Sequence, residues 1–225
     1  MDKTQIIKSV KKAREGSPKR NFLQRFDFIA NLQDIDIKKP DEKIDLFVTL
    51  PHGTGKDIKI CAFVDDALIS EAKKEFYKAI HKDEFGALSR NKPEMRRLAK
   101  ECDFFVAQAN LMPDIASNFG KILGPKGKMP NPKAGCIIPP KAQLKPLKER
   151  LKKLVRLQTK NEPIVKCLVG SENMDDAAIV DNILAVHTAL VHALPKGEAN
   201  IKSMFLKLTM GKPATIGAKK GGEEK

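Results

Sequence analysis

The sequence predicts an α/β protein in which both ends of the chain form one domain around an inserted second domain. Before about residue 65 and after about residue 160, apolar and polar residues alternate as in half-buried antiparallel strands. In the middle of the chain, short helices alternate with hydrophobic strands. Each outer piece has only about 65 residues, which is short for independent folding. Packing them together solves this problem. We therefore expect a discontinuous domain of residues 1–66 and 160–225 and an inserted α/β domain of residues 67–159.

The first outer piece predicts one helix followed by strands. Residues 2–15 place Ile6, Ile7 and Val10 among many charges, which is typical of an exposed amphipathic helix. A Gly-Ser-Pro turn follows. Apolar and polar residues then alternate with a period of two, which indicates half-buried antiparallel strands at 24–32, 44–50 and 57–63.

The middle of the chain predicts helices and buried strands in alternation. Pro113 and Pro146 both stand where the first turn of a helix tolerates proline. Between the helices that they open lies a stretch dense in Gly and Pro, residues 120–140. The expected elements are helices at 68–82, 94–100, 112–119 and 142–157, and a strand at 103–109.

The last outer piece returns to the pattern of the first. Residues 163–169 and 200–209 are expected as strands. Between them, residues 175–194 form an amphipathic helix that begins at Asp175 and is stopped by Pro195. The outer pieces therefore share one kind of structure, helix on antiparallel sheet.

Composition narrows the class of protein. The chain has 225 residues, a formal charge of +14 and a 41% hydrophobic share, which together argue against wholesale disorder. No apolar run reaches the roughly 18–20 residues of a membrane span, so no membrane partner is expected. The N-terminus lacks the apolar core of a signal peptide, which predicts a cytoplasmic protein. A polyanion is the expected partner.

The excess charge is concentrated in one stretch. Residues 119–160 hold 12 basic side chains and one acidic residue, Glu149, and so carry +11 of the +14. Such density is typical of phosphate contacts. The alternative is a solvated face that keeps the protein soluble.

Catalytic and metal chemistry is not expected. The four cysteines lie far apart with no C-x-x-C pair, so they are interpreted as reduced thiols that fill cores. The turn Gly53-Thr54-Gly55-Lys56 lacks the spacing of a phosphate-binding loop and is better explained as a tight turn between strands. Neither a G-x-G-x-x-G turn nor a convergent acid/base pair is present. We expect no enzyme activity, no cofactor and no metal.

Two kinds of RNA contact remain open from the residues alone. The run Gly124-Pro125-Lys126-Gly127 looks like the G-x-x-G loop of a KH module, although prolines follow where that module continues into a helix, so a KH-like single-strand binder is the alternative function. Phe22 stands at a loop-to-strand junction, where it could stack on a base. Ser203, Thr209 and Gly211 offer hydroxyls and bare backbone at a strand edge, or are simply turn residues.

A long signature gives a resemblance to a known family. The run Leu111-Met112-Pro113 and then Gly120-Lys121-Ile122-Leu123-Gly124-Pro125-Lys126-Gly127-Lys128-Met129-Pro130-Asn131-Pro132-Lys133-Ala134-Gly135 closely resembles that of the ribosomal protein L-one family, which forms the mobile stalk of the large subunit. Supporting matches are Leu50-Pro51-His52-Gly53-Thr54-Gly55-Lys56, Val169-Gly170 and Thr209-Met210-Gly211. The short N-terminus and Ile137-Ile138-Pro139-Pro140 resemble the archaeal type.

The resemblance implies a Rossmann-like inserted domain and a structural role in the large ribosomal subunit. It also implies binding to the stalk region of the large rRNA, assistance in releasing deacylated tRNA from the exit site, and repression of translation through the protein's own mRNA. The free protein is expected to be a monomer. Carried over by motif and by neighbourhood, the specific RNA contacts are expected at Arg20, Phe22, Gln24, Lys166, Ser203, Thr209, Met210 and Gly211.

The resemblance and the charge point to different parts of the chain. The specific contacts are expected on the chain ends, which carry almost no net charge, whereas the basic stretch lies in the middle. We therefore expect a division of roles, with long-range attraction and contacts to neighbouring RNA or tRNA in the middle. The residues expected to make these secondary contacts are Lys121, Lys126, Lys128 and Lys133.

Overall fold

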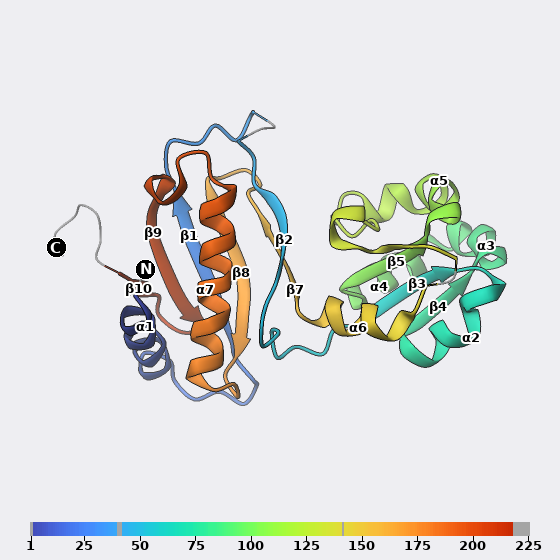
Figure 1. Ribbon diagram of the computed structural model, residues 1–225. Helices are drawn as coiled ribbons and strands as arrows, with labels where there is room; N and C mark the ends of the chain where they lie inside the picture. Colours follow the sequence, from blue (N-terminus) through green and yellow to red (C-terminus); the bar gives the residue numbers. More distant parts are fainter. Residues whose placement is uncertain (1, 40–41, 141, 218–225) are drawn as a thin grey trace. The chain divides into compact units, whose positions relative to one another are not determined.

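The computed structural model describes residues 2–39, 42–140 and 142–217, and it divides into two compact units (Figure 1). Unit 1 consists of Met1–Lys56 and Lys153–Lys225, and unit 2 consists of Asp57–Lys152. Each unit has a hydrophobic cluster of its own. The mixture of antiparallel and parallel sheets confirms the expected α/β class.

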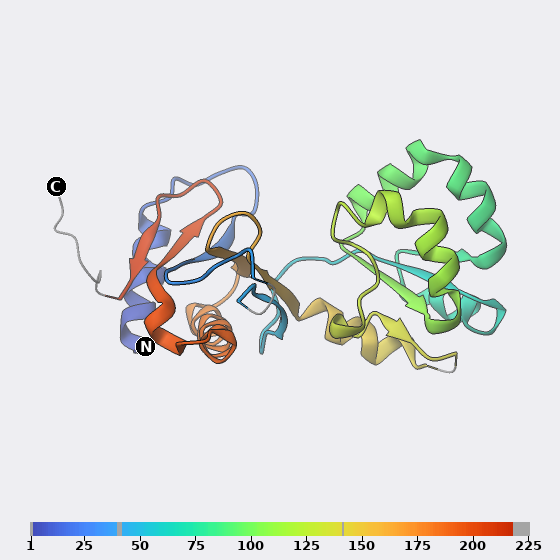
Figure 2. The same ribbon diagram turned by 90° about the horizontal axis from the view of Figure 1, so that it is seen from above.

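Unit 1 is a four-stranded antiparallel sheet with two helices on one face. The strand order is β10-β9-β1-β8. Figure 2 shows the long helix almost end-on, on one side of these strands. The elements are α1 (Lys3–Glu15), β1 (Arg25–Leu32), β8 (Ile164–Ser171), α7 (Asp176–Ala193), β9 (Ile201–Leu208) and β10 (Ala214–Ile216).

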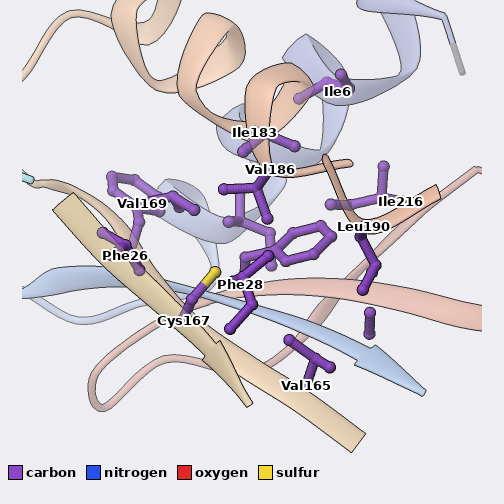
Figure 3. Packing of buried hydrophobic residues seen from close by; sticks show 14 of the residues in the cluster. Ile6, Phe26, Phe28, Val165, Cys167, Val169, Ile183, Val186, Leu190 and Ile216 are labelled. Carbon is purple, nitrogen blue, oxygen red and sulfur yellow. The ribbon is translucent and has the colours of Figure 1, made fainter. Parts of the chain in front are cut away.

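The alternation in β1 explains how the helices are held. Phe26, Phe28 and the other residues on one face of the strand are fully or almost fully buried, whereas the residues between them are partly exposed. Phe28 lies beside Cys167 of β8 and beside Leu206 of β9 in the sheet register. Figure 3 shows Phe28 and Cys167 under Ile183 and Val186 of α7, and all four side chains belong to one hydrophobic cluster. The helix therefore stays in place through burial of apolar area.

A second, two-stranded sheet completes unit 1 and corrects one expectation. β2 (Asp45–Thr49) pairs with β7 (Leu154–Gln158) in antiparallel register. The helix expected at 142–157 is therefore wrong after Lys152, where α6 (Leu144–Lys152) ends. Leu154 and Val155 fit the helical stripe of Leu144, Leu147 and Leu151, but pairing with β2 decides for a strand. Arg156 reinforces the pair by donating to both carboxylate oxygens of Asp45, at 2.7 and 2.8 Å.

Unit 2 has a parallel sheet with the strand order β4-β3-β5-β6. In Figure 1, α5 lies on one side of this sheet and α2 and α6 on the other. The elements besides α6 are β3 (Ile60–Val64), α2 (Asp66–Glu75), β4 (Lys78–His81), α3 (Phe85–Arg90), α4 (Lys92–Glu101), β5 (Phe104–Gln108), α5 (Met112–Leu123) and β6 (Ile137–Ile138). Short 3-10 turns are η1 (Lys82–Glu84), η2 (Ala109–Leu111), η3 (Pro132–Ala134) and, in unit 1, η4 (Gly197–Asn200).

Two sequence expectations for this unit are wrong. The strand at 57–63 was expected to be half-buried and antiparallel, but β3 is buried along its whole length and pairs in parallel with β4 and β5. The helix expected at 68–82 ends at Glu75, and β4 follows it. The chain therefore passes between units after Lys56 and after Lys152, earlier than the boundaries at 66/67 and 159/160. β3 belongs to unit 2, and β7 belongs to unit 1.

The core of unit 2 centres on Phe63. Its ring lies 5.5 Å from that of Phe85, 5.8 Å from that of Phe105 and 5.4 Å from that of Phe119. Offset-stacked and edge-to-face pairs at such distances add to the free energy gained by burial. These ring contacts hold α3 and α5 against the same face of the sheet.

The tight turn after β2 has a structural role. Gly53 and Gly55 both have positive φ (68° and 66°), as expected for a turn that needs glycine. Fully buried Asn182 of α7 accepts from the His52 amide and donates to the carbonyls of Gly53 and Val169, at 2.7 to 3.1 Å. The turn is therefore held against α7.

No helix among the described residues is both long and apolar enough to cross a bilayer.

Candidate nucleic-acid interface

Two segments almost 200 residues apart in sequence meet at one end of the unit 1 sheet. The first is the loop 16–24, which precedes β1, and the second is the turn 209–211, which follows β9. The side-chain oxygen of Gln24 accepts from the Ser17 hydroxyl (3.1 Å) and from the Met210 amide (3.3 Å). The Gln24 amide group also donates to the Pro18 carbonyl at 3.3 Å. One side chain therefore ties both segments together.

Gln24 differs in exposure from the other expected contacts. Its side chain is fully buried, so it positions the loop and does not face an RNA. Its backbone N–H and C=O both bond to Glu172, at 3.2 and 3.0 Å. Buried polar groups whose hydrogen bonds are satisfied in this way make a loop rigid.

Arg14 braces the same region from α1. Its guanidinium donates to the Asp176 carboxylate and to the carbonyls of Glu172 and Met174, each at 2.8 Å. It also lies over the Phe26 ring, 5.1 Å from the centroid. Arg14 and Glu172 are not among the residues expected from the sequence, because no local pattern distinguishes them from other charged residues in a helix and a loop.

Thr209 closes the end of β9 onto the start of β1. Its hydroxyl oxygen accepts from the Arg25 amide at 3.1 Å and lies 3.3 Å from the Arg25 carbonyl, to which it donates. Thr209 is nevertheless exposed. A hydroxyl has two lone pairs, so one acceptor position remains for an external donor.

Gly211 allows the turn to approach the loop closely. A Cβ at this position would lie 3.1 Å from the Ser17 Cβ and 3.3 Å from the Leu208 Cβ. Both distances are shorter than ordinary van der Waals contacts. The bare backbone of Gly211 is therefore what lets the two segments pack together.

This close approach predicts the effect of Gly211→Ala. The added methyl group pushes the turn 209–211 away from Ser17, so we expect affinity for RNA to fall about 10-fold, the equivalent of one polar contact. Overpacking should destabilise the protein by about 1 kcal/mol. Filter binding and thermal unfolding measure the two effects.

Gly120→Ala is the matched control. A Cβ at Gly120, inside α5, meets nothing within 4 Å. This variant should bind RNA normally and should be slightly more stable, since Ala suits a helix better than Gly. Wild-type affinity of Gly211→Ala would contradict the packing argument.

Exposed apolar side chains gather at the loop and the turn. Phe22, Leu23 and Met210 are 51%, 47% and 58% exposed. They are three of only five large hydrophobic residues exposed in the described part of the chain, and Arg20 beside them is exposed too. A rigid site with an exposed aromatic ring, a thioether and a cation suits stacking on unpaired bases and contact with phosphate.

Lys166 and Ser203 lie elsewhere on the same sheet. Both are on the face opposite the helices: Lys166 of β8 pairs with Ile29, and Ser203 of β9 pairs with Asn31. Ile29 is four residues along β1 from Arg25, which corresponds to about 14 Å. The Ser203 hydroxyl accepts from the Asn31 amide group at 3.0 Å. The structure thus brings the expected residues onto one unit but not into one cluster.

The open face also holds charged residues that the sequence analysis did not single out. Asp27 and Lys207 are paired across the β1 and β9 strands, beside the exposed Arg25. Partial burial raises the pKa of the Asp27 carboxyl, against the opposing effect of Lys207 and Arg25.

The four lysines expected to make secondary contacts belong to unit 2 and differ in availability. Lys121 and Lys133 are exposed. Lys126 is exposed and donates to the Arg96 carbonyl at 3.2 Å. Lys128 is half-buried and donates to the Cys102 carbonyl at 2.6 Å, where it caps the end of α4. Lys128 is therefore better explained as a structural residue.

The basic stretch 119–160 is not one surface. Arg156 lies in unit 1 and pairs with Asp45, and Lys148 pairs with Glu75 at 3.3 Å. The acidic partners come from other parts of the sequence. The number of basic residues in this stretch therefore overstates the positive charge that a single RNA strand would contact.

The Gly124–Gly127 loop does not continue as a KH module does. α5 precedes it, but a turn and the short helix Pro132–Ala134 follow, and then β6. Gly127 has a positive φ of 63°, and its amide bonds to the Gly124 carbonyl. The loop is a tight C-terminal turn of α5.

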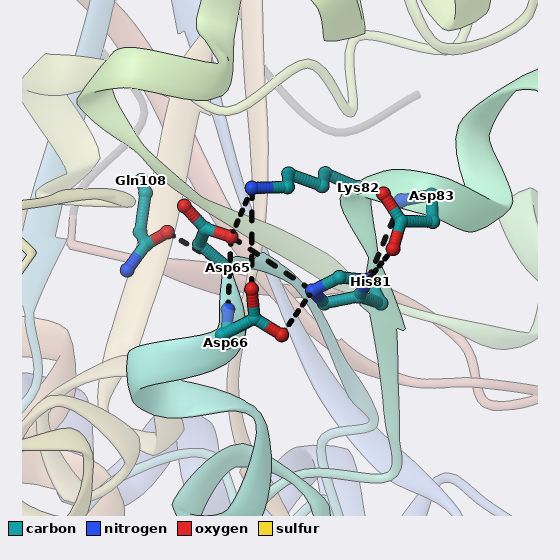
Figure 4. Close-up of polar contacts among 6 residues, drawn as sticks. All are labelled: Asp65, Asp66, His81, Lys82, Asp83 and Gln108. Atoms are coloured by element: carbon teal, nitrogen blue, oxygen red, sulfur yellow. Dashed lines mark hydrogen bonds and ion pairs between the residues drawn. The ribbon is translucent and has the colours of Figure 1, made fainter.

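Acidic residues and a histidine gather at the carboxyl ends of β3 and β4 (Figure 4), where parallel sheets commonly bind ligands. Ligand atoms of Asp65, Asp66 and His81 lie within 4.8 Å of one another. The Lys82 ammonium lies 2.8 Å from the Asp65 carboxylate and, with the Asp66 amide, lowers the pKa of Asp65. His81 Nε2 lies 3.1 Å from Asp66. The Lys82 ammonium thus already compensates negative charge in this cluster.

All four cysteines are free and buried, as expected of thiols that fill cores. Burial raises the pKa of Cys136 to about 11 and that of Cys167 to about 12. Both thiols therefore stay protonated near neutral pH.

Comparisons with known proteins agree with this architecture. The model of the "Ribosomal protein L1p/L10e family" matches residues 10–212. The chain is 46% identical to the large ribosomal subunit protein uL1 of Methanocaldococcus jannaschii over 94% of both chains. It is 42% identical to uL1 of Pyrococcus abyssi and 40% identical to uL1 of Thermococcus kodakarensis, over 93% of this chain and 94% and 95% of theirs.

Proposed function

Because this chain belongs to the ribosomal protein L1p/L10e family and is a structural protein of the large ribosomal subunit, we propose that unit 1 binds the stalk region of the large rRNA. The observation that supports this most is the junction of loop 16–24 and turn 209–211 through Gln24. It presents Phe22 and Met210 to solvent on a rigid base. Rigid, exposed stacking groups are what recognition of a folded RNA requires.

We further propose two activities that depend on RNA binding. The protein helps deacylated tRNA to leave the exit site, and it represses translation of its own mRNA. The second follows if the message folds into a structure like that of the stalk rRNA, because one surface then binds both. The localisation that follows is the cytoplasmic ribosome.

A filter-binding comparison tests the binding proposal. The probes are an rRNA stalk fragment, an unstructured single-stranded RNA and a duplex DNA, all at the same salt concentration. We expect the stalk fragment to bind on the order of 10³-fold more tightly than either other probe, as specific sites do over non-specific ones. Equal affinity for the unstructured RNA would support a KH-like single-strand binder instead and would overturn the proposal.

The two further activities have tests of their own. Added protein should lower in vitro translation of its own mRNA but not of an unrelated message. Ribosomes reconstituted without the protein should release deacylated tRNA more slowly than complete ribosomes. Unchanged translation or release would contradict the corresponding activity but not the binding to rRNA.

A further inference from the structure

A groove between α4 and α5 of unit 2 is lined almost entirely by basic and apolar side chains. Its volume is about 550 Å³. Five of its eight lining residues are basic and none is acidic. The basic residues are Arg96, Arg97, Lys100, Lys121 and Lys126.

The sequence of α4 explains why three cations share one side of this helix. Met95, Leu98 and Ala99 face the core. Positions 96, 97 and 100 follow the helical repeat on the opposite side and are exposed. The stretch from 93 to 100 spans about 10 Å along the axis.

The turn after α5, which forms the opposite wall, is held to α4 by lysine side chains that bond to backbone carbonyls. Lys126 donates to the Arg96 carbonyl, and Lys128 donates to the Cys102 carbonyl. The Lys128 amide also bonds to the Leu123 carbonyl, at 3.1 Å. The turn after α5 is thereby held beside α4, so the groove is pre-formed.

The charge in the groove is poorly compensated within the described residues. Arg97 has one carboxylate neighbour, Glu101 on its own helix, at 3.6 Å. Arg96, Lys100 and Lys121 have no ion-pair partner in that part of the chain. Some other lysines of unit 2, namely Lys78, Lys148 and Lys152, pair with glutamates. Several uncompensated like charges in a concave surface concentrate anions there.

We propose that this groove is a second RNA-binding site, which holds the phosphates of an RNA strand. The proposal rests on the proposed RNA-binding function of the protein and adds Arg96, Arg97 and Lys100, which the basic stretch does not include. A length of about 10 Å accommodates about three phosphates of a stacked strand. Pro93, Ile122 and Pro125 offer an apolar floor for sugars and base edges, which favours a nucleic acid over free phosphate.

The test compares two triple variants that lose the same charge. The groove variant combines Arg96→Gln, Arg97→Gln and Lys100→Gln. The control combines Lys73→Gln, Lys74→Gln and Lys145→Gln, which are exposed residues of α2 and α6 on the other side of the sheet. Affinity is measured against salt concentration with two probes, the rRNA stalk fragment and deacylated tRNA, because either could supply the strand.

We expect the groove variant to reduce the slope of log K against log salt by about 2 for at least one probe, since each lost phosphate contact contributes about 0.7–0.9. The control should leave both slopes close to those of the wild type. The probe whose slope changes identifies the source of the strand. Equal changes in both triple variants, or no change in the groove variant with either probe, would overturn the proposal.

A second variant and one further readout separate this proposal from the proposed function. Lys121→Gln with Lys126→Gln, on the opposite wall, should lower the same slope, and thermal unfolding checks that both variants fold. Thr209→Val should weaken stalk binding with an unchanged slope. If the wild type does not discriminate the stalk fragment at all, the proposed function fails, while the tRNA slopes still report on the groove.

Discussion

Replacing Phe63 by Ala is expected to lower the free energy of unfolding of unit 2 by about 3–5 kcal/mol, the typical cost of removing a buried aromatic ring. Phe63 is fully buried on β3, and its ring contacts those of Phe85, Phe105 and Phe119. The substitution would leave a cavity lined by these three aromatic rings, and we expect them to move little to fill it. Since whole domains are stable by only about 5–15 kcal/mol, this loss is large.

Urea denaturation followed by circular dichroism measures the effect. The hydrophobic clusters of the two units are separate. We therefore expect an early transition from unit 2, after which the protein still binds the stalk rRNA fragment in preference to an unstructured RNA. Loss of this preference together with unit 2 would show that specific recognition needs unit 2.

Phe22→Ala is the matched control, because it makes the same substitution at an exposed site. Phe22 is half exposed in the loop before β1, so its removal should change stability by less than about 0.5 kcal/mol. If it stacks on a base, affinity for the stalk fragment should fall by about 1–3 kcal/mol. The two phenylalanines should thus give opposite results in the two assays.

Replacing Thr209 by Val should reduce affinity for the stalk fragment about 10- to 100-fold with almost no change in salt slope. Valine keeps the shape of the side chain but removes the hydroxyl that bonds to Arg25 N–H and C=O. The lost hydrogen bonds join the turn 209–211 to the start of β1, and each is worth about 1 kcal/mol. No charge is removed, so counterion release on binding stays the same.

Thr209→Ser is the control for this prediction, because it retains the hydroxyl. It should restore most of the affinity. If Thr209→Val lowered the salt slope as the groove variant does, the proposed division between shape-specific and electrostatic contacts would be wrong.

The division between shape-specific and electrostatic contacts stays a prediction, but the electrostatic contacts are expected at other residues than the charge count suggests. The +11 of residues 119–160 is spread over both units and is partly neutralised by Asp45 and Glu75, which lie outside that stretch. Positive charge gathers instead in the groove where α4, outside that stretch, faces Lys121 and Lys126. Charge counted along a sequence does not include partners that folding brings in.

The strongest local patterns predicted their elements well. The helices at 2–15 and 175–194 and the strands at 24–32, 163–169 and 200–209 all match the structure to within about two residues at each end. Each has one buried face, so its apolar period is set by its own geometry. One error falls where that condition fails, at β3, which is buried along its whole length.

The sequence by itself determined the family resemblance, the α/β class, the basic character and most of the residues expected to contact RNA, because these depend on residue identity and local periodicity. Only the tertiary structure decided that residues 154–158 form a strand with β2 and that Gln24 is buried. It also decided that Lys128 caps α4, and that α4 and α5 make a basic groove. These outcomes depend on contacts between segments far apart in the chain, whose free energies exceed local preference.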